Sequence, residues 1–316
     1  MNNRIRPILF KILKFAIIGA IFYFVINNVV SNWEQLAAQG VHFDPLYALL
    51  SILVMMLAWL TTSWSWGKTL EAFGAKLKYR DVFVIYFRSM IGKYLPGKFW
   101  QIVGSTYLAS KRGVQEGPTI ASVVVGQVYS LFSGLVIFMS AIAIWGMNFS
   151  SGSIFNFKLP SICVLVLILI LSLNPNLTKP AMNWFLRLFK RTEIDVEIDI
   201  RQSLRLFILF LIPWFAFGFS FWLFARSLTF VPFGQYLKLT SIMVGATVIG
   251  FLAIFSPGGL GIREGMIVIL MTSMTEYSVS FSSAVAVGYR FLSLIVEMVA
   301  FCLTWAINGK RNTIHG

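Results

Sequence analysis

Seven charged side chains lie inside apolar runs of this sequence or beside breaks in them, where a charge is costly unless it has a role. Five are basic and two are acidic: Arg88, Lys93, Lys98, Arg263, Glu264, Arg290 and Glu297. A pocket shared by these side chains would be electropositive. An arginine guanidinium matches two phosphate oxygens at once, and a lysine ammonium adds a point charge. The set therefore predicts a site that binds a phosphate group.

Two of these charges belong to the segment from Phe255 to Gly265, which reads Phe-Ser-Pro-Gly-Gly-Leu-Gly-Ile-Arg-Glu-Gly. Proline removes a backbone donor, and glycine permits turns that are closed to other residues. The residues concerned are Pro257, Gly258, Gly259 and Gly261. We expect one helix to end here and another to start near Ile262. Irregular backbone within a membrane persists only when it is buried in protein or lines a wet cavity; a loop at the membrane surface is the plainer alternative.

A second break lies between two short apolar stretches, residues 82–91 and 99–109. Neither stretch reaches the ~20 residues that span a bilayer. We therefore predict a re-entrant hairpin over residues 81–113 with Pro96 and Gly97 at its tip, and keep a pair of interfacial helices as the alternative. Trp100 and Gln101 follow the tip and are candidates to line the same cavity, although tryptophan at a membrane interface is the commoner arrangement.

The composition indicates a helical membrane protein. Apolar residues make up 58% of the chain and charged residues 12%, about half the charged fraction of a soluble domain. The net charge of +14 fits cytoplasmic loops that face anionic lipids, so we do not expect nucleic acid as a partner. With two cysteines in apolar runs and two histidines, we expect no disulfide framework, no metal site and no cofactor.

The sequence predicts an all-α polytopic membrane protein with about six spanning helices and two broken or re-entrant hairpins. The expected helices cover residues 7–30, 45–66, 118–145, 160–173, 203–227 and 281–307. Basic residues flank both ends of the chain, which predicts that both termini are cytoplasmic. The basic connector 174–205 is also expected in the cytoplasm. Residues 193–200 alternate with period two, as a strand does, but we favour a solvated connector over an edge for a protein partner.

The order of the apolar stretches and Pro-Gly breaks divides the chain into two transmembrane halves. Residues 1–150 hold three helices and the hairpin 81–113, and residues 158–316 hold three helices and the broken segment 235–276. Three crossings in each half would invert one half relative to the other. Inverted repeats place substrate sites near the membrane midplane, where their paired breaks meet. If segment 235–276 crosses the membrane twice instead, the topology still closes.

Arg290 and Glu297 are seven residues apart and so share one face of the last helix. For Glu297 we favour a structural ion pair. For Lys98, Arg263 and Arg290 we favour contact with a ligand, with Glu264 holding one of the arginines in place.

Three motifs carry a resemblance to a known family: Leu95-Pro96-Gly97, Pro257-Gly258-Gly259-Leu260-Gly261-Ile262-Arg263-Glu264, and Tyr289-Arg290. Together they resemble the lysylphosphatidylglycerol synthase transmembrane-region family over nearly the whole chain. That family includes the flippase half of the multiple peptide resistance factor and standalone relatives. The resemblance implies an integral membrane protein that handles lipids.

Two departures from the family pattern bear on the substrate. The sequence ends at Gly316 with no soluble aminoacyltransferase domain, so we do not expect synthesis of a lysyl-lipid. Where family members often carry Gly-Glu followed by Arg, this chain has Lys98-Phe99-Trp100-Gln101, which leaves the identity of the lipid open.

We therefore expect a multi-pass protein of a bacterial or archaeal cytoplasmic membrane that binds and translocates a phosphate-bearing lipid of the cell envelope. The lipid would be an anionic phospholipid or a polyprenyl-phosphate-linked glycan. One alternative is an enzyme, or an enzyme subunit, that modifies lipid-linked sugars or envelope lipids; we favour transport because no nucleophile–base or metal constellation is visible. Another is a scaffold that binds a glycosyltransferase through the connector, and self-association of the chain is a further alternative.

Overall fold

The computed structural model describes residues 42–95, 99–147, 158–173, 199–253 and 256–312. Within these ranges every regular element is a helix, so the predicted all-α polytopic fold class is confirmed. Three sets of predicted features lie outside the described residues: the first helix at 7–30, the tip residues Pro96, Gly97 and Lys98, and most of the connector 174–205.

Nine α-helices and three short 3-10 helices are described. They are α3 (Pro45–Ala72), α4 (Tyr79–Met90), η1 (Ile91–Tyr94), α5 (Trp100–Ser110), α6 (Glu116–Trp145), α7 (Lys158–Leu173), α9 (Ile200–Leu228), η2 (Phe233–Gln235), α10 (Tyr236–Leu252), η3 (Pro257–Gly259), α11 (Ile262–Met274) and α12 (Val279–Asn312). Five described stretches are long and apolar enough to cross a membrane: Pro45–Ala72, Glu116–Trp145, Ile200–Leu228, Phe233–Leu252 and Val279–Ile307. The chain is a multi-pass membrane protein.

Local capping explains where two of the long helices begin. The Asp44 carboxylate accepts a hydrogen bond from the Leu46 backbone N–H at 2.9 Å, and Asp199 accepts one from Gln202 at 2.7 Å. Such caps stabilise a helix by ~1 kcal/mol each. Because Asp199 caps α9, that helix starts at Ile200, three residues before the predicted start.

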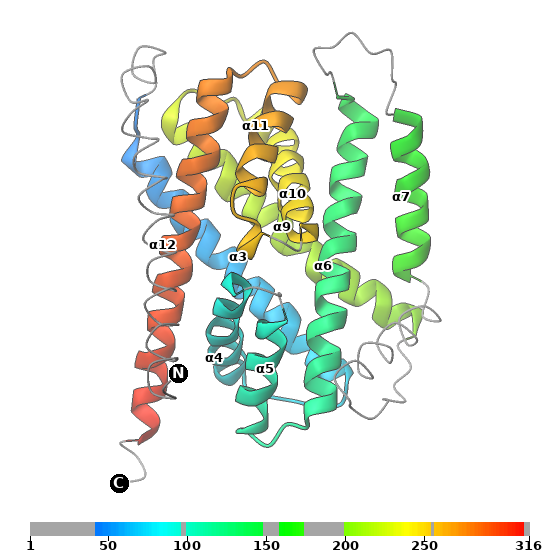
Figure 1. Ribbon diagram of the computed structural model, residues 1–316, viewed down its shortest axis with the longest axis vertical. Coiled ribbons are helices and arrows are strands. Elements are labelled where there is room, and N and C mark those ends of the chain that lie inside the picture. Colours follow the sequence, from blue (N-terminus) through cyan, green and yellow to red (C-terminus); the bar gives the residue numbers. More distant parts are fainter. Residues whose placement is uncertain (1–41, 96–98, 148–157, 174–198, 254–255, 313–316) are drawn as a thin grey trace, which may run out of the picture.

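The helices α3 and α9 form a closely packed pair that runs diagonally across the molecule (Figure 1). At their crossing, Ser51 Oγ donates to the Ser220 carbonyl oxygen at 2.7 Å, and Ser220 Oγ donates to the Ser51 carbonyl at 2.8 Å. Small polar residues let membrane helices approach closely while satisfying their own hydroxyl groups. This pair forms the frame behind the two hairpins.

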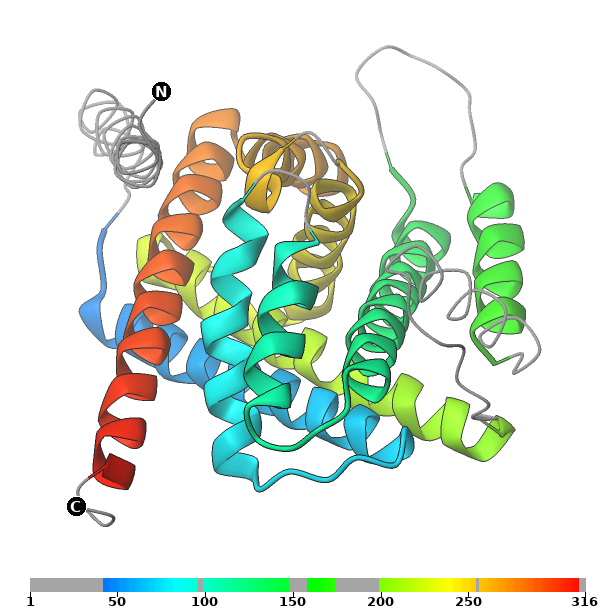
Figure 2. The same cartoon turned by 60° about the horizontal axis from the view of Figure 1, so that its bottom comes forward.

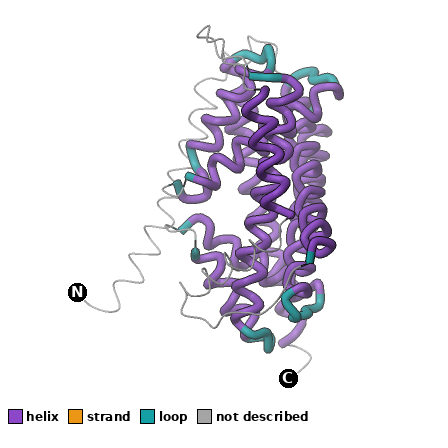
Figure 3. Tube along the Cα trace, turned by 90° about the vertical axis from the view of Figure 1, so that its right-hand side faces the viewer, coloured by secondary structure: helices purple, strands orange, loops and turns teal. Residues whose placement is uncertain are grey.

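Two helical hairpins enter the molecule from opposite ends. The helices α4 and α5 pack together and turn back at η1, and α10 and α11 pack together and turn back at η3. In Figure 1 the α4–α5 hairpin rises from the end where α12 finishes, and the α10–α11 hairpin descends from the other end. The two turns face each other midway along the molecule (Figure 3), and η1 is in contact with η3.

The surroundings of the hairpins explain how broken helices are tolerated. The α4–α5 hairpin is enclosed by α3, α6 and α12, as Figure 2 shows from below. In the described part of its turn, Gly92 of η1 is buried in protein, as irregular backbone within a bilayer requires. That the two halves of the chain form an inverted repeat stays a prediction.

Candidate functional site

The turn of the α10–α11 hairpin depends on glycine. Gly258, Gly259 and Gly261 have φ angles of +62°, +72° and +79°, values that glycine adopts without strain. A Cβ atom on Gly258 would lie 2.9 Å from Cε1 of Tyr94 and 3.3 Å from Nη2 of Arg290. This glycine therefore serves two purposes: it makes the turn, and it lets the opposite hairpin approach.

Arg290 fastens this turn to α12. Its Nη2 donates to the Gly258 carbonyl oxygen at 3.1 Å, and its Nε lies 3.3 Å from Oε1 of Glu264. The second contact is an ion pair without hydrogen-bond geometry. The other carboxylate oxygen of Glu264 accepts the backbone N–H of Gly261 at 2.6 Å, which caps α11. Arg290 is only 3% exposed, so it acts as a buried strut between α12 and the hairpin.

Glu297 fastens the other turn in the same way. Lys93 Nζ lies 2.7 Å from its Oε1, and the Tyr94 hydroxyl donates to its Oε2 at 2.7 Å. Glu297 is 6% exposed, and the Lys93 ammonium also lies 4.9 Å from the ring centroid of Trp59. Because Arg290 and Glu297 are two turns apart on one face of α12, this helix holds both hairpin tips.

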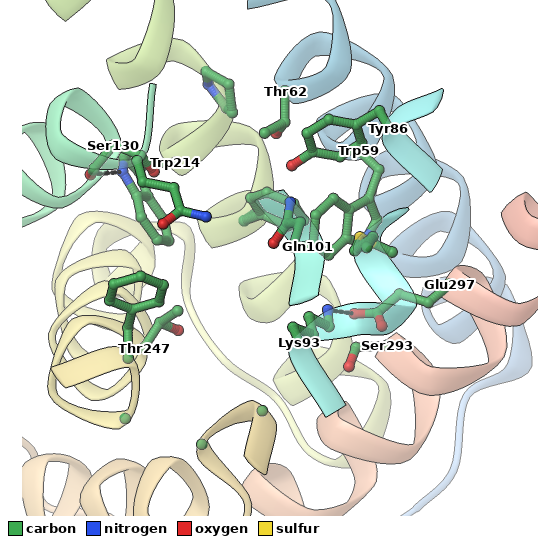
Figure 4. A pocket seen from close by; sticks show the side chains of 18 of the residues that line it. Trp59, Thr62, Tyr86, Lys93, Gln101, Ser130, Trp214, Thr247, Ser293 and Glu297 are labelled. Atoms are coloured by element: carbon green, nitrogen blue, oxygen red, sulfur yellow. Dashed lines mark hydrogen bonds and ion pairs between the residues drawn. The ribbon is translucent and has the colours of Figure 1, made fainter. Parts of the chain in front are cut away.

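A cavity of about 240 Å³ lies where the tips meet (Figure 4). Its charged lining residues are Lys93, Arg263, Arg290 and Glu297. Its neutral polar lining includes Thr62, Gln101, Ser105, Gln127, Ser130, Thr247 and Ser293, and its aromatic walls include Trp59, Trp66, Tyr86, Phe210, Trp214, Phe217 and Tyr289. The cavity thus joins a charged end to a neutral, aromatic end.

The predicted site residues differ in where they lie relative to the cavity. Those that line the cavity are Lys93, Gln101, Gly258, Gly259, Arg263, Arg290 and Glu297. Gly261 and Glu264 lie directly behind it, in the cap of α11. Pro257 contributes to η3 through its backbone, and Pro96, Gly97 and Lys98 are outside the described residues.

Two predicted residues lie elsewhere. Arg88 donates to the Thr304 side-chain oxygen at 3.0 Å and stacks over the ring of Trp305, so it joins α4 to the end of α12. Trp100 is 40% exposed and is not part of the cavity wall.

Arg263 differs from the other cations of the cavity. Among the residues that the structure describes, no acceptor or carboxylate is bonded to its guanidinium. Lys93 and Arg290 each hold a carboxylate. The cluster contains Lys93, Arg263 and Arg290 against Glu264 and Glu297, a net charge of 3 − 2 = +1 among the described residues. The unbalanced charge is on Arg263.

The backbone around Arg263 presents this guanidinium at the start of a helix. Arg263 is the second residue of α11, where the unpaired N–H groups and the helix dipole favour an anion. A Cβ on Gly250 would lie 3.1 Å from Cβ of Arg263, so glycine in α10 lets the start of α11 pack closely. The cavity therefore offers an anion one arginine that has no partner among the described residues.

Sequence reasoning missed several residues of the hairpin tips and of the cavity. Tyr94 was not singled out, although it lies between Lys93 and the predicted tip. Trp59 and Trp66 are seven residues apart on α3 and face the same cavity. Gln127, an amide in the middle of the apolar helix α6, carried the clearest signal, because a polar side chain at that depth needs a partner.

The model of one protein family, the lysylphosphatidylglycerol synthase TM region, matches residues 11–300. The chain belongs to this family. The match covers nearly the whole chain, including both hairpins and the cavity between them, and it supports a role connected with membrane lipids. No curated protein matches the sequence. Within the described part of the chain, no three His, Cys, Asp or Glu side chains gather as a metal site would require.

Proposed function

We propose that this protein binds the phosphate group of a membrane lipid in the cavity between the hairpin tips and translocates that lipid across the membrane. The observation that carries the proposal is Arg263, a cation at a helix start that lines the cavity and has no partner among the described residues. Burying or half-burying an arginine without a counterion costs free energy unless an anion binds to it. A lipid phosphate supplies that anion and fits the guanidinium fork.

The arrangement of the hairpins supports transport. Each tip is fastened to α12 by its own ion pair, Arg290 with Glu264 on one side and Glu297 with Lys93 on the other. Releasing one tip while keeping the other would open the cavity toward one end of the molecule at a time. Alternating access around a fixed midplane site works in this manner. We propose that α12 stays in place while the two hairpins move relative to it.

Covalent chemistry has less support in this cavity. The two carboxylates nearest its charged end, Glu264 and Glu297, both hold a basic partner. A general base needs a free carboxylate within reach of the reacting group. We therefore favour translocation over the enzymatic alternative. We further propose a bacterial or archaeal cytoplasmic membrane, with the connector 174–205 on the cytoplasmic side.

A reconstituted translocation assay tests the proposal. Proteoliposomes would contain phosphatidylglycerol with a nitrobenzoxadiazole label on one acyl chain, and dithionite would bleach only the label in the outer leaflet. We expect Arg263→Ala to slow translocation at least tenfold, and Arg263→Lys to restore it in part, because a point charge replaces the fork. Arg201→Ala is the matched control, since Arg201 is an exposed arginine at the start of α9.

An Arg263→Ala protein that translocates at the wild-type rate would contradict the proposal. Arg290→Ala is a poorer test because it removes the partner of Glu264 and a hydrogen bond to the Gly258 turn. Its loss of activity would report structure as well as binding.

A further inference from the structure

The neutral end of the cavity holds hydrogen-bonding groups that lack partners. The indole Nε1 atoms of Trp59 and Trp66 are buried and unpaired. Within the described residues the side-chain amides of Gln101 and Gln127 have no partner either. All four side chains line the cavity, and Figure 4 shows Gln101 projecting into it with Trp59 on the adjacent wall. The indole N–H groups have almost no accessible surface, whereas Gln101 and Gln127 are only partly buried. The two amides are therefore the unpaired groups that a ligand or ordered water in the cavity can reach.

These groups converge from three helices. Trp59 and Trp66 come from one face of α3, Gln101 from α5 and Gln127 from α6. Trp66 is only 4% exposed, so its N–H cannot turn to bulk solvent. None of the four is charged, and the charged side chains of the cavity belong to the hairpin tips and α12. Gln101 and Gln127 therefore form a neutral donor–acceptor subsite beside the cationic one.

The same cavity is unsuited to a cationic headgroup. Glu297 is the carboxylate among its described lining residues, and both of its oxygens are bonded, to Lys93 and to Tyr94. The aromatic face of Trp59 already lies against the Lys93 ammonium. An ammonium group entering the cavity would find no free acceptor carboxylate and would meet a net positive charge.

We infer that the headgroup carried by the lipid is neutral and rich in hydroxyl groups, a polyol or a sugar ring joined to the phosphate. This inference rests on the proposed function: the phosphate lies at Arg263, and the hydroxyls bond to the amides of Gln101 and Gln127. Hydroxyl groups both donate and accept, as amides do. At about 240 Å³ the cavity is smaller than the ~300–1,000 Å³ sites of drug-sized ligands, so it accommodates a headgroup while the acyl chains lie outside.

Binding of four lipids to the full-length protein in detergent, followed by native mass spectrometry, tests the inference. The lipids share their acyl chains and differ in the headgroup: phosphatidylinositol, phosphatidylglycerol, phosphatidylethanol and lysyl-phosphatidylglycerol. Phosphatidylethanol keeps the phosphodiester charge but has no headgroup hydroxyl. We expect phosphatidylinositol and phosphatidylglycerol to bind about tenfold more tightly than phosphatidylethanol, and lysyl-phosphatidylglycerol to bind no more tightly than phosphatidylethanol.

Variants connect this preference to the cavity. The double variant Gln101→Ala/Gln127→Ala should reduce binding of the two hydroxylated lipids to the level of phosphatidylethanol. Unchanged binding of phosphatidylethanol would show that the variant is folded. Gln202→Ala is the matched control, because Gln202 is exposed at the start of α9, and it should leave all four affinities unchanged.

The outcomes separate this inference from the proposed function. Equal affinities for phosphatidylethanol and the hydroxylated lipids, with all of them weakened by Arg263→Ala, would overturn the headgroup inference alone. Tightest binding of lysyl-phosphatidylglycerol would do the same. If none of the four lipids responds to Arg263→Ala, the phosphate site itself is wrong and both proposals fail.

Discussion

The contact between the hairpin tips can be tested by adding one methyl group. Gly258 and Gly261 both have left-handed backbones, with φ of +62° and +79°, so alanine at either position costs ~1–2 kcal/mol. Only at Gly258 does the new Cβ meet the opposite hairpin, 2.9 Å from Tyr94 Cε1; at Gly261 nothing lies within 4 Å. Overpacking of this kind costs a further ~1–3 kcal/mol. Gly258→Ala should therefore cost about 2–5 kcal/mol and Gly261→Ala about 1–2 kcal/mol.

Thermal unfolding in detergent, followed by tryptophan fluorescence, would rank the two variants. We expect a lower melting temperature for Gly258→Ala than for Gly261→Ala, and slower lipid translocation, because the methyl group also displaces Arg290 from the turn. Two variants with the same melting temperature and the same rate would show that the tips do not meet as described. The argument from Tyr94 and Arg290 would then be refuted.

Three further predictions follow from the ion pairs and the hairpins. Glu297→Gln leaves the partly buried Lys93 without its carboxylate and should destabilise the fold by up to ~3–5 kcal/mol. The double variant Lys93→Met/Glu297→Gln should be more stable than Glu297→Gln in the same unfolding assay, and a double variant less stable than Glu297→Gln would argue against the pair. Arg88→Ala should lower the melting temperature but leave lipid binding unchanged, since its guanidinium bonds to α12 outside the cavity; weakened binding would place it in the site after all. In a cysteine-free background, cysteines at Lys78 and Tyr277 should react with impermeant maleimide from opposite sides of the membrane; labelling from one side would contradict the opposed hairpins.

The hairpins and the main cations of the cavity could be predicted because their signals are local. Proline and glycine beside charges, inside apolar runs, mark a break whatever the tertiary structure is. Arg290 and Glu297 could be placed on one face because helical spacing is fixed. The prediction that the cavity contains Lys93, Arg263 and Arg290 needed only these two rules.

Pairing across elements could not be predicted in the same way. The sequence favoured Arg263 for ligand contact because it follows the glycine turn. It could not show that Arg88 bonds to Thr304 or that Arg263 has no partner among the described residues. Both are arginines in apolar surroundings, and their roles depend on which distant helix lies beside them. The neutral end was missed for a related reason, because Trp59 and Gln127 are far apart in the chain and meet only when α3 and α6 pack around the cavity.

The most direct test of the phosphate site is a cryo-electron microscopy structure of the protein in nanodiscs that contain phosphatidylglycerol, with a bound antibody fragment to aid alignment. We predict phosphate density in the cavity between the hairpin tips, ~2.7–2.9 Å from the guanidinium nitrogens of Arg263. The same density should be absent from the Arg263→Ala protein. Lipid phosphates found only at the two membrane surfaces, with the cavity holding water alone, would contradict the account.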